Sequence, residues 1–135
     1  MARYLLDTNH ISPLVTPGHR LQGILSQRFR AGDSFGIAVP ALTEMLFGIL
    51  TLPRAVSNLK TWQSIDRMYT YYQIEKEDAE HAADLQVVLR RRGWQLGTID
   101  ALIASIALRY DLILLTTDND YKAISALQQV NWLAG

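Results

Sequence analysis

The sequence predicts an α/β fold, with a central parallel β-sheet between two layers of helices. Two observations support this prediction. Short apolar runs begin near Arg3, Phe35 and Leu112, and side chains that are apolar at successive positions are typical of strands buried on both faces of a sheet. The longer segments between these runs repeat apolar residues with helical spacing. Strands that alternate with helices form βαβ units, which give parallel strands with helices packed on both faces.

The expected strands are short and separated by helical segments. We expect strands at residues 3–6, 35–39, 71–74, 112–115 and 129–132. A turn or short helix is expected at residues 9–13, and longer helices are expected to begin near Thr16, Pro40, Pro53, Lys76 and Thr98. The first of these longer helices is expected to have Thr16 as its N-cap and Pro17 at its first position.

Length and composition indicate one folded domain that spans residues 1–135. Hydrophobic residues make up 49% and charged residues 19%, which is typical of globular and not of disordered chains. No apolar run approaches the ~20 residues that cross a bilayer, and Asp7 interrupts the apolar start that a signal peptide would need. The chain has no cysteine for a disulfide or thiolate metal site. We therefore expect a cytoplasmic protein without membrane contact, and its net charge of zero gives no overall attraction to nucleic acid.

Acidic residues follow two of the expected strands. Asp7 ends the first apolar run in the stretch RYLLDTN, and Asp118 and Asp120 follow the strand in LILLTTDND. Ligands bind to open parallel sheets outside the carboxyl ends of the strands, so we expect these three acids at one edge of the sheet. Each acid also has a simpler interpretation, because Asp7 could cap the next helix and the other two could be turn residues.

Two more acids lie in apolar surroundings near the start of a helix. Glu44 follows the second strand by about one turn, and Asp100 lies in the first turn of the helix that begins at Thr98. Both are expected to point toward the same edge of the sheet, although the helix dipole would favour Asp100 there without any ligand. Together with Asp7 and Asp118 they would repel one another and take up protons unless a cation neutralised them. The set of four therefore favours a metal site over separate caps.

The donor set predicts Mg²⁺ or Mn²⁺, because it offers oxygen ligands alone. Divalent ions held by carboxylates activate water and stabilise the charge that develops in phosphodiester hydrolysis, so no protein nucleophile is required. The sequence offers none, since it has neither a cysteine nor a G-x-S-x-G motif. His10 is close to Asp7 in the chain, but we interpret it as a histidine on a helix surface and not as a ligand. Asn9 and Thr116 could bond a ligand water or a carboxylate, or could cap turns.

Four features occur in order over nearly the whole chain: LLDTN at the start, Glu44 within its helix, IDALIASIAL around Asp100, and LLTTDNDY near the end. In these features the chain resembles the PIN domain, and more specifically the VapC-type toxin ribonucleases of bacterial toxin–antitoxin pairs. The resemblance implies a PIN-like fold and a metal-dependent endoribonuclease that hydrolyses RNA. It also implies a homodimer and a cognate antitoxin that covers the site.

The resemblance also implies roles for particular residues. The residues that match the family's acidic positions are Asp7, Glu44, Asp100 and Asp118. Thr116 matches the hydroxyl residue two positions before the last acid, and Asn9 matches the polar residue after the first acid. Asp120 either supports the preceding acid or only caps the turn.

Other classes of protein share parts of this pattern. A phospho-receiver domain gathers acids at a sheet edge, but it needs adjacent acids after the first strand and a lysine after a late strand, which this sequence lacks. A D-x-D phosphatase is disfavoured because Asn9 stands where the second aspartate would be. A PIN-like module that only binds RNA or a partner would not need the acids. A PIN nuclease of RNA processing that is not a toxin stays open.

Three further patterns concern partners. We interpret the basic stretch Arg90-Arg91-Arg92 as a solvated helix end in preference to a patch that guides RNA. The aromatic residues Trp62, Tyr69, Tyr71 and Tyr72 are interpreted as packing residues and not as platforms for bases. Helices at 41–52 and 53–72 carry more apolar residues than one side of a helix pair can bury, which predicts a groove for an antitoxin helix. These residues are Met45, Phe47, Ile49, Leu50, Leu52 and Trp62.

Overall fold

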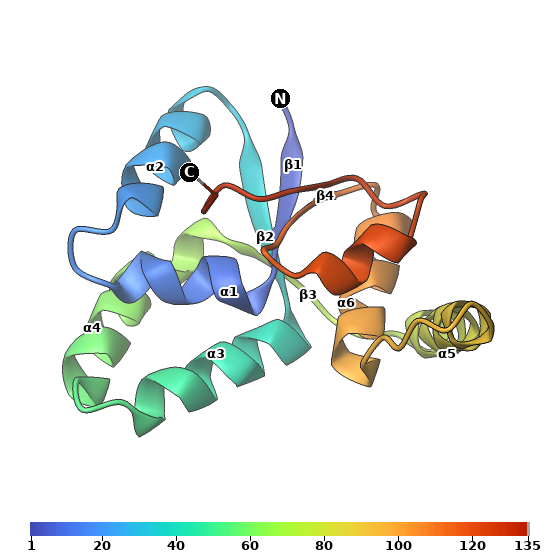
Figure 1. The fold of residues 1–135 in the computed structure, drawn as a ribbon. Helices are drawn as coiled ribbons and strands as arrows, with labels where there is room; N and C mark the ends of the chain where they lie inside the picture. The colour runs from blue at the N-terminus through green and yellow to red at the C-terminus, as the bar shows by residue number, and fades with distance from the viewer. Residues whose placement is uncertain (135) are drawn as a thin grey trace.

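The computed structural model describes residues 1–134 and has the three-layer α/β/α architecture that the sequence predicts. A five-stranded sheet forms the middle layer, and helices lie on both sides of it (Figure 1). The strands are β1 Arg3–Leu6, β2 Ser34–Ala38, β3 Thr70–Tyr72, β4 Ile113–Leu115 and β5 Gln129–Val130.

The sheet is parallel throughout, with the strand order β3-β2-β1-β4-β5. β1 is the central strand, where Leu5 pairs with Gly36 of β2 on one side and with Leu114 of β4 on the other. The chain continues from β1 to β2 on one side, whereas it continues from β4 to β5 on the other. The boundary between β1 and β4 is therefore the topological switch point, which is where open parallel sheets bind their ligands.

Helices fill the connections between the strands. Within residues 1–134 the α-helices are α1 Thr8–Ile11, α2 Arg20–Arg30, α3 Val39–Thr51, α4 Ala55–Ile65, α5 Lys76–Arg91 and α6 Thr98–Arg109. Short 3₁₀ helices are η1 Ser12–Val15, η2 Asp66–Met68 and η3 Asn119–Ala123. None of the helices in this part of the chain has both the length and the hydropathy of a membrane-spanning segment.

Helix α2 begins later than the sequence predicts. The expected start at Thr16–Pro17 was wrong, because Gly18 has φ +72°, a left-handed conformation that interrupts a right-handed helix. The helix begins at Arg20 instead. His19 is its N-cap, and the ring Nδ1 accepts a hydrogen bond from the backbone N–H of Leu21 (3.1 Å).

The core is formed by the strands and by the helix faces that cover them. The strand residues Leu5, Leu6, Ile37, Leu114 and Leu115 are fully buried. Trp62 and Tyr69 are also buried and stack on each other with ring centroids 5.7 Å apart, so their interpretation as packing residues is confirmed.

Candidate active site

The switch point between β1 and β4 collects the predicted acids. Asp7 directly follows β1, and Asp118 follows β4 after two threonines. Glu44 comes from α3, which begins where β2 ends, and Asp100 comes from the first turn of α6. The charges of the other three acids are close enough to raise the pKa of Asp100. All four predicted carboxylates therefore lie near the same edge of the sheet.

Asp7 is buried, with 4% of its surface exposed, and both of its carboxylate oxygens accept hydrogen bonds. Oδ1 accepts from the backbone N–H of Thr8 (2.9 Å), so Asp7 is the N-cap of α1. Oδ2 accepts from the Thr116 hydroxyl (2.7 Å) and from the Asn9 amide (3.2 Å). Burial raises the pKa of Asp7, the donors Thr116 and Thr8 partly lower it, and two nearby acids raise it further. Asp7 is thus a helix cap and also one of the acids at this edge of the sheet. We call these acids, Asp7, Glu44, Asp100, Asp118 and Asp120, the acid group.

A buried histidine orients the amide of Asn9. The backbone N–H of Trp132 donates to Nε2 of His10 (3.1 Å), so the ring proton of the neutral histidine is on Nδ1. Nδ1 then donates to Oδ1 of Asn9 (2.8 Å), which turns the NH₂ group of Asn9 toward Asp7. The backbone N–H of Thr117 also donates to Oδ1 of Asn9 (3.1 Å). These contacts select one of the two possible orientations of the amide.

The prediction that His10 lies on a helix surface was wrong. Its side chain is fully buried, and the segment that contains Trp132 contacts it. Burial lowers the pKa of His10 to about 4, which keeps the ring neutral at pH 7. Helix α1 has four residues, and so short a helix has too few positions for periodicity to reveal its buried face.

Thr116 links the ends of the two central strands. Its hydroxyl donates to Oδ2 of Asp7 and accepts from the backbone N–H of Asp118 (3.0 Å). Both interpretations offered by the sequence therefore hold, because Thr116 positions a carboxylate and also shapes the turn after β4.

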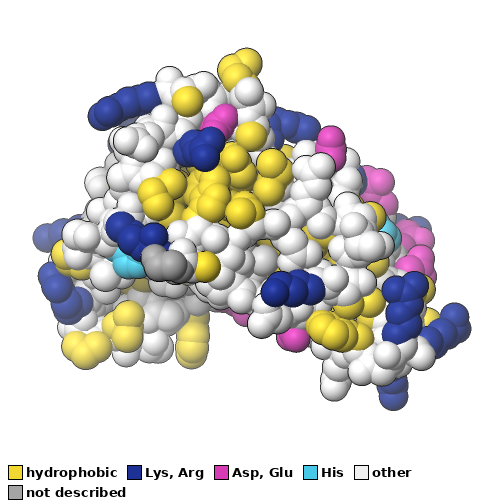
Figure 2. Space-filling view, turned by 45° about the horizontal axis from the view of Figure 1, so that its top comes forward, with side chains coloured by type: hydrophobic (Ala, Val, Ile, Leu, Met, Phe, Trp, Pro, Cys, Tyr) yellow, Lys and Arg dark blue, Asp and Glu magenta, His cyan; other side chains and the backbone are white. Residues whose placement is uncertain are grey.

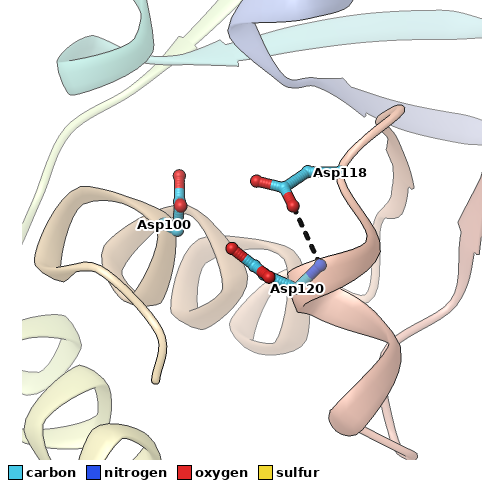
Figure 3. Close-up of side chains that lie close together, drawn as sticks. All are labelled: Asp100, Asp118 and Asp120. Carbon is cyan, nitrogen blue, oxygen red and sulfur yellow. Dashed lines mark hydrogen bonds between the residues drawn. The ribbon is translucent and has the colours of Figure 1, made fainter. Parts of the chain in front are cut away.

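Asp100, Asp118 and Asp120 form a compact cluster, in which one carboxylate oxygen of each lies within 4.8 Å of the others. Figure 3 shows Asp100 on α6 facing the other two, which come from the start of η3. Oδ1 of Asp118 accepts from the backbone N–H of Asp120 (2.8 Å). Carboxylate oxygens at this spacing are the ligands that Mg²⁺ and Mn²⁺ prefer, so the donor set fits the metal that the sequence predicts.

The carboxyl group of Asp100 is strongly affected by its surroundings. Burial is the largest cause of a rise in its pKa to about 6, and the charge of Asp7 is the next. The hydroxyl of Tyr121 donates to Oδ1 of Asp100 (3.1 Å) and opposes part of this rise. A bound cation would neutralise the repulsion that raises the pKa, so the same crowding that destabilises the free carboxylate favours metal binding.

Glu44 and Asp7 border this cluster but are not part of it. Within residues 1–134, the three clustered aspartates are the acids that meet at ligand spacing. Glu44 is exposed on α3, and its Oε1 accepts from the Thr8 hydroxyl (3.0 Å). Because Thr8 also binds Asp7, this contact connects the two bordering acids.

Two residues that the sequence analysis did not assign also contact the acids. Tyr121 is fully buried, and burial followed by the charge of Asp7 raises the pKa of its hydroxyl, so it stays a neutral donor to Asp100. The indole N–H of Trp94 donates to the backbone carbonyl of Asp120 (2.9 Å). Tyr121 stands directly after the acidic motif, and Trp94 stands in a polar loop where a large aromatic residue is out of character. These two positions were the features of the sequence that could have indicated the contacts.

Fold and site together define an α/β domain that gathers carboxylates at the switch point of a parallel sheet. The sequence matches the PIN domain over residues 4–127, and the chain belongs to this family. This membership excludes the phospho-receiver alternative. No curated protein matches the sequence.

Several solved structures share the fold. VapBC2 from Rickettsia felis, bound to a DNA fragment from its promoter, matches with a TM-score of 0.85 and 20% identity, covering 96% of this chain and 98% of that chain. DNA-bound VapBC from Salmonella typhimurium matches with a TM-score of 0.81 and 19% identity, covering 98% and 99%. VapC20 from Mycobacterium tuberculosis, described as a sarcin-ricin loop cleaving toxin, matches with a TM-score of 0.67 and 11% identity, covering 90% and 95%. At these identities the comparison establishes the fold.

Proposed function

We propose that this protein is a metal-dependent endoribonuclease and the toxin of a toxin–antitoxin pair. The observation that supports the proposal most directly is the Asp100–Asp118–Asp120 cluster at the switch point of a PIN domain. Its donor set suits Mg²⁺ or Mn²⁺, and ions held in this way catalyse phosphodiester hydrolysis. RNA as the substrate rests on the resemblance to VapC toxins, and the fold shared with the loop-cleaving toxin VapC20 supports it.

The cluster would hold the ion, with Asp7 and Glu44 beside it. When bound, the ion supplies positive charge at the phosphate and lowers the pKa of a bound water. The chain itself contributes a rigid arrangement of carboxylates. Thr116 and Asn9 prevent Asp7 from turning away, and Tyr121 orients Asp100. Such preorganised charge stabilises a transition state without reorganisation during the reaction.

The proposed activity is tested by incubating the purified protein with labelled RNA in Mg²⁺ or Mn²⁺. We expect endonucleolytic products, complete loss of cleavage in excess EDTA, and recovery when the divalent ion is restored. The variant Asp118→Asn should be inactive under all three conditions. Cleavage by the wild type that persists in excess chelator would contradict the metal-dependent mechanism.

The apolar surface of α3 and α4 is smaller than the sequence predicts. Met45, Ile49 and Trp62 are buried in the core, so they are not available to a partner. Phe47 and Leu50 are 70% and 58% exposed, and they stay on the surface of α3.

A groove beside these helices leads to the acid group. It has a volume of about 310 Å³, and its walls include Val15, Leu52 and Glu44. An apolar helix face laid against α3 and α4 would bury the exposed residues, and its end would reach Glu44. We assign this surface to the cognate antitoxin, and the shared fold with a toxin–antitoxin complex from Klebsiella pneumoniae (TM-score 0.72, 19% identity) supports the assignment.

Expression in bacteria tests the toxin assignment. Expression of the wild type alone should arrest growth, and co-expression of the small gene beside it should relieve the arrest. A double variant Phe47→Ser/Leu50→Ser should stay toxic but lose this relief, whereas Val88→Ser, exposed on α5, should keep it. Harmless expression of the soluble wild type would contradict the toxin assignment and favour a PIN nuclease of RNA processing.

The resemblance also implies a homodimer, which we propose for this chain. Sedimentation of the purified protein measures it directly, and a mass of one chain at micromolar concentration would contradict it.

A further inference from the structure

A second hollow lies along the C-terminal half of α5 and the loop that follows it. Its volume is about 630 Å³, and neither the acid cluster nor the surface assigned to the antitoxin includes it. Val87 and Arg90 line it from α5, and Trp94 lines it from the loop. Trp94 is 37% exposed, so part of its ring is accessible to a ligand.

Hydrogen bonds fix the loop that forms one wall of this groove. The indole N–H of Trp94 donates to the carbonyl of Asp120 (2.9 Å), which places the ring next to a member of the cluster. Gln86 of α5 donates to the carbonyl of Leu96 (3.0 Å) and to the hydroxyl of Thr98 (3.3 Å), which holds both the loop and the start of α6 against α5. Trp94 therefore connects the groove to the segment that carries Asp120.

The groove combines an aromatic face with a free positive charge. Across residues 1–134, the ion pairs of basic side chains involve Arg28, Lys76 and Arg109, so Arg90 is left without an acidic partner. Figure 2 shows Lys and Arg side chains around hydrophobic ones at the end of the molecule where α5 lies. An accessible aromatic ring beside an unpaired guanidinium is the combination that binds single-stranded nucleic acid through stacking and phosphate contact.

We propose that this groove is a subsite for single-stranded RNA, in which a base beside the scissile phosphate stacks on Trp94 and a flanking phosphate contacts Arg90. The proposal rests on the proposed function and adds where the substrate strand runs. The hydrogen bond from Trp94 to the segment that carries Asp120, together with the free charge of Arg90, favours RNA over a second copy of this chain as the occupant. It also changes the interpretation of Arg90-Arg91-Arg92, since the first of these arginines lines the groove.

Two substitutions of Trp94 separate stacking from a structural role. Trp94→Ala removes the ring and the N–H, whereas Trp94→Phe keeps a smaller aromatic face and removes the hydrogen bond to Asp120. With a short labelled single-stranded RNA, we expect Trp94→Ala to raise KM about tenfold with a much smaller change in kcat. Trp94→Phe should stay within about threefold of the wild-type KM. Equal losses of kcat in both variants would show that Trp94 only supports Asp120, and would overturn the subsite.

The charge is tested with neighbouring arginines. Arg90→Gln should raise KM, and the dependence of log KM on log salt should become shallower by about 0.7, as expected for one lost phosphate contact on a single strand. Arg92→Gln is the matched control, because Arg92 lies outside the groove and should leave KM and its salt dependence unchanged. Identical behaviour of the two variants would count against a specific phosphate contact.

A measurement of RNA binding under conditions without cleavage tests the subsite separately from the proposed function. Fluorescence anisotropy of the same RNA in EDTA should show weaker binding for Trp94→Ala than for the wild type and for Trp94→Phe. If the wild type fails to cleave RNA but this order of affinities holds, the nuclease assignment fails and the subsite stands. If the wild type cleaves and Trp94→Ala binds as well as the wild type, the subsite fails alone. Dissociation of a dimer by Trp94→Ala in sedimentation would assign the groove to a second copy and overturn the proposal.

Discussion

Asp7 and Asp118, at two ends of the acid group, differ in how many hydrogen bonds their carboxylate oxygens accept. Asp7 is buried, and its carboxylate accepts from Thr8, Asn9 and Thr116. Asp118 is only partly buried, and in the described part of the chain its carboxylate accepts from one backbone N–H, that of Asp120. Hydrogen bonds within the fold hold the carboxylate of Asp7 in place, whereas the carboxylate of Asp118 keeps free lone pairs and faces other carboxylates.

This difference separates effects on stability from effects on activity. Removal of a carboxylate that satisfies buried donors leaves these donors unpaired, which costs about 1–3 kcal/mol. Removal of a carboxylate that mainly faces like charges relieves repulsion in the metal-free protein. Substitutions at the two ends should therefore agree in activity and differ in stability.

The largest expected effect comes from removing each carboxylate. Asp7→Ala and Asp118→Ala should both reduce RNA cleavage by about 100-fold or more, because each removes charge from the site that holds the ion. In EDTA, Asp7→Ala should lower the free energy of unfolding by about 2 kcal/mol, whereas Asp118→Ala should leave it unchanged or raise it. Urea denaturation measures both. Equal destabilisation by the two variants would show that the different hydrogen bonding of Asp7 and Asp118 does not affect the free energy of unfolding.

A smaller effect is expected from removing the Thr116 hydroxyl, which bonds both Asp7 and the backbone N–H of Asp118. Thr116→Val removes the donor to Asp7 and the acceptor for the Asp118 N–H at nearly constant volume. Unfolding should become easier by about 1–2 kcal/mol, and cleavage should fall about 10- to 100-fold, as for other residues that orient metal ligands. Thr117→Val is the control, because this exposed side chain should be replaceable within about 0.5 kcal/mol and with activity retained.

The smallest expected effect is a dependence of stability on pH that is caused by Asp100. Its pKa is about 6 in the folded protein, above the value of about 3.9 in an unfolded chain. The folded state therefore binds this proton more tightly, so the contribution of Asp100 favours folding below about pH 4 and is lost as the pH rises through about 6.

Urea denaturation in EDTA at pH 5 and pH 7.5 measures this contribution. The loss of stability between the two pH values should be smaller in Asp100→Asn than in the wild type. Asp84→Asn, exposed on α5, should keep the wild-type difference. If Asp100→Asn loses as much stability between the two pH values as the wild type, groups other than Asp100 cause the pH dependence.

The fold and the acids could be predicted because their signals are local. Apolar runs mark β1, β2 and β4; Asp7 follows the first of these runs directly, and Asp118 follows the last after two threonines. The rule that ligands bind at the carboxyl edge of a parallel sheet then brings distant acids together without any knowledge of side-chain contacts. Glu44 and Asp100 could be predicted from their place in apolar sequence near a helix start, and the family motifs then matched both positions.

The contacts that orient the acids could not be predicted, because they join segments far apart in the chain. His10 is buried by a segment more than a hundred residues away, and a pattern confined to a four-residue helix cannot show this. The hydroxyl of Tyr121 reaches Asp100 across 21 positions, and the indole of Trp94 reaches Asp120 across 26. The error at Thr16 has a local cause, since the conformation of Gly18 outweighs the preference of Thr and Pro for a helix start.

The central place of β1 also sets the order in which the site can be assembled during synthesis. β1 is made first, but the donor Thr116, which directly follows the neighbouring strand β4, lies 109 positions after Asp7. A growing chain carries Asp7 and Glu44 long before it carries Asp118 and Asp120, the two cluster members that follow β4. The cluster therefore cannot form before β4 and the loop after it have been made, so a growing chain would lack the site to which we assign the proposed cleavage of RNA.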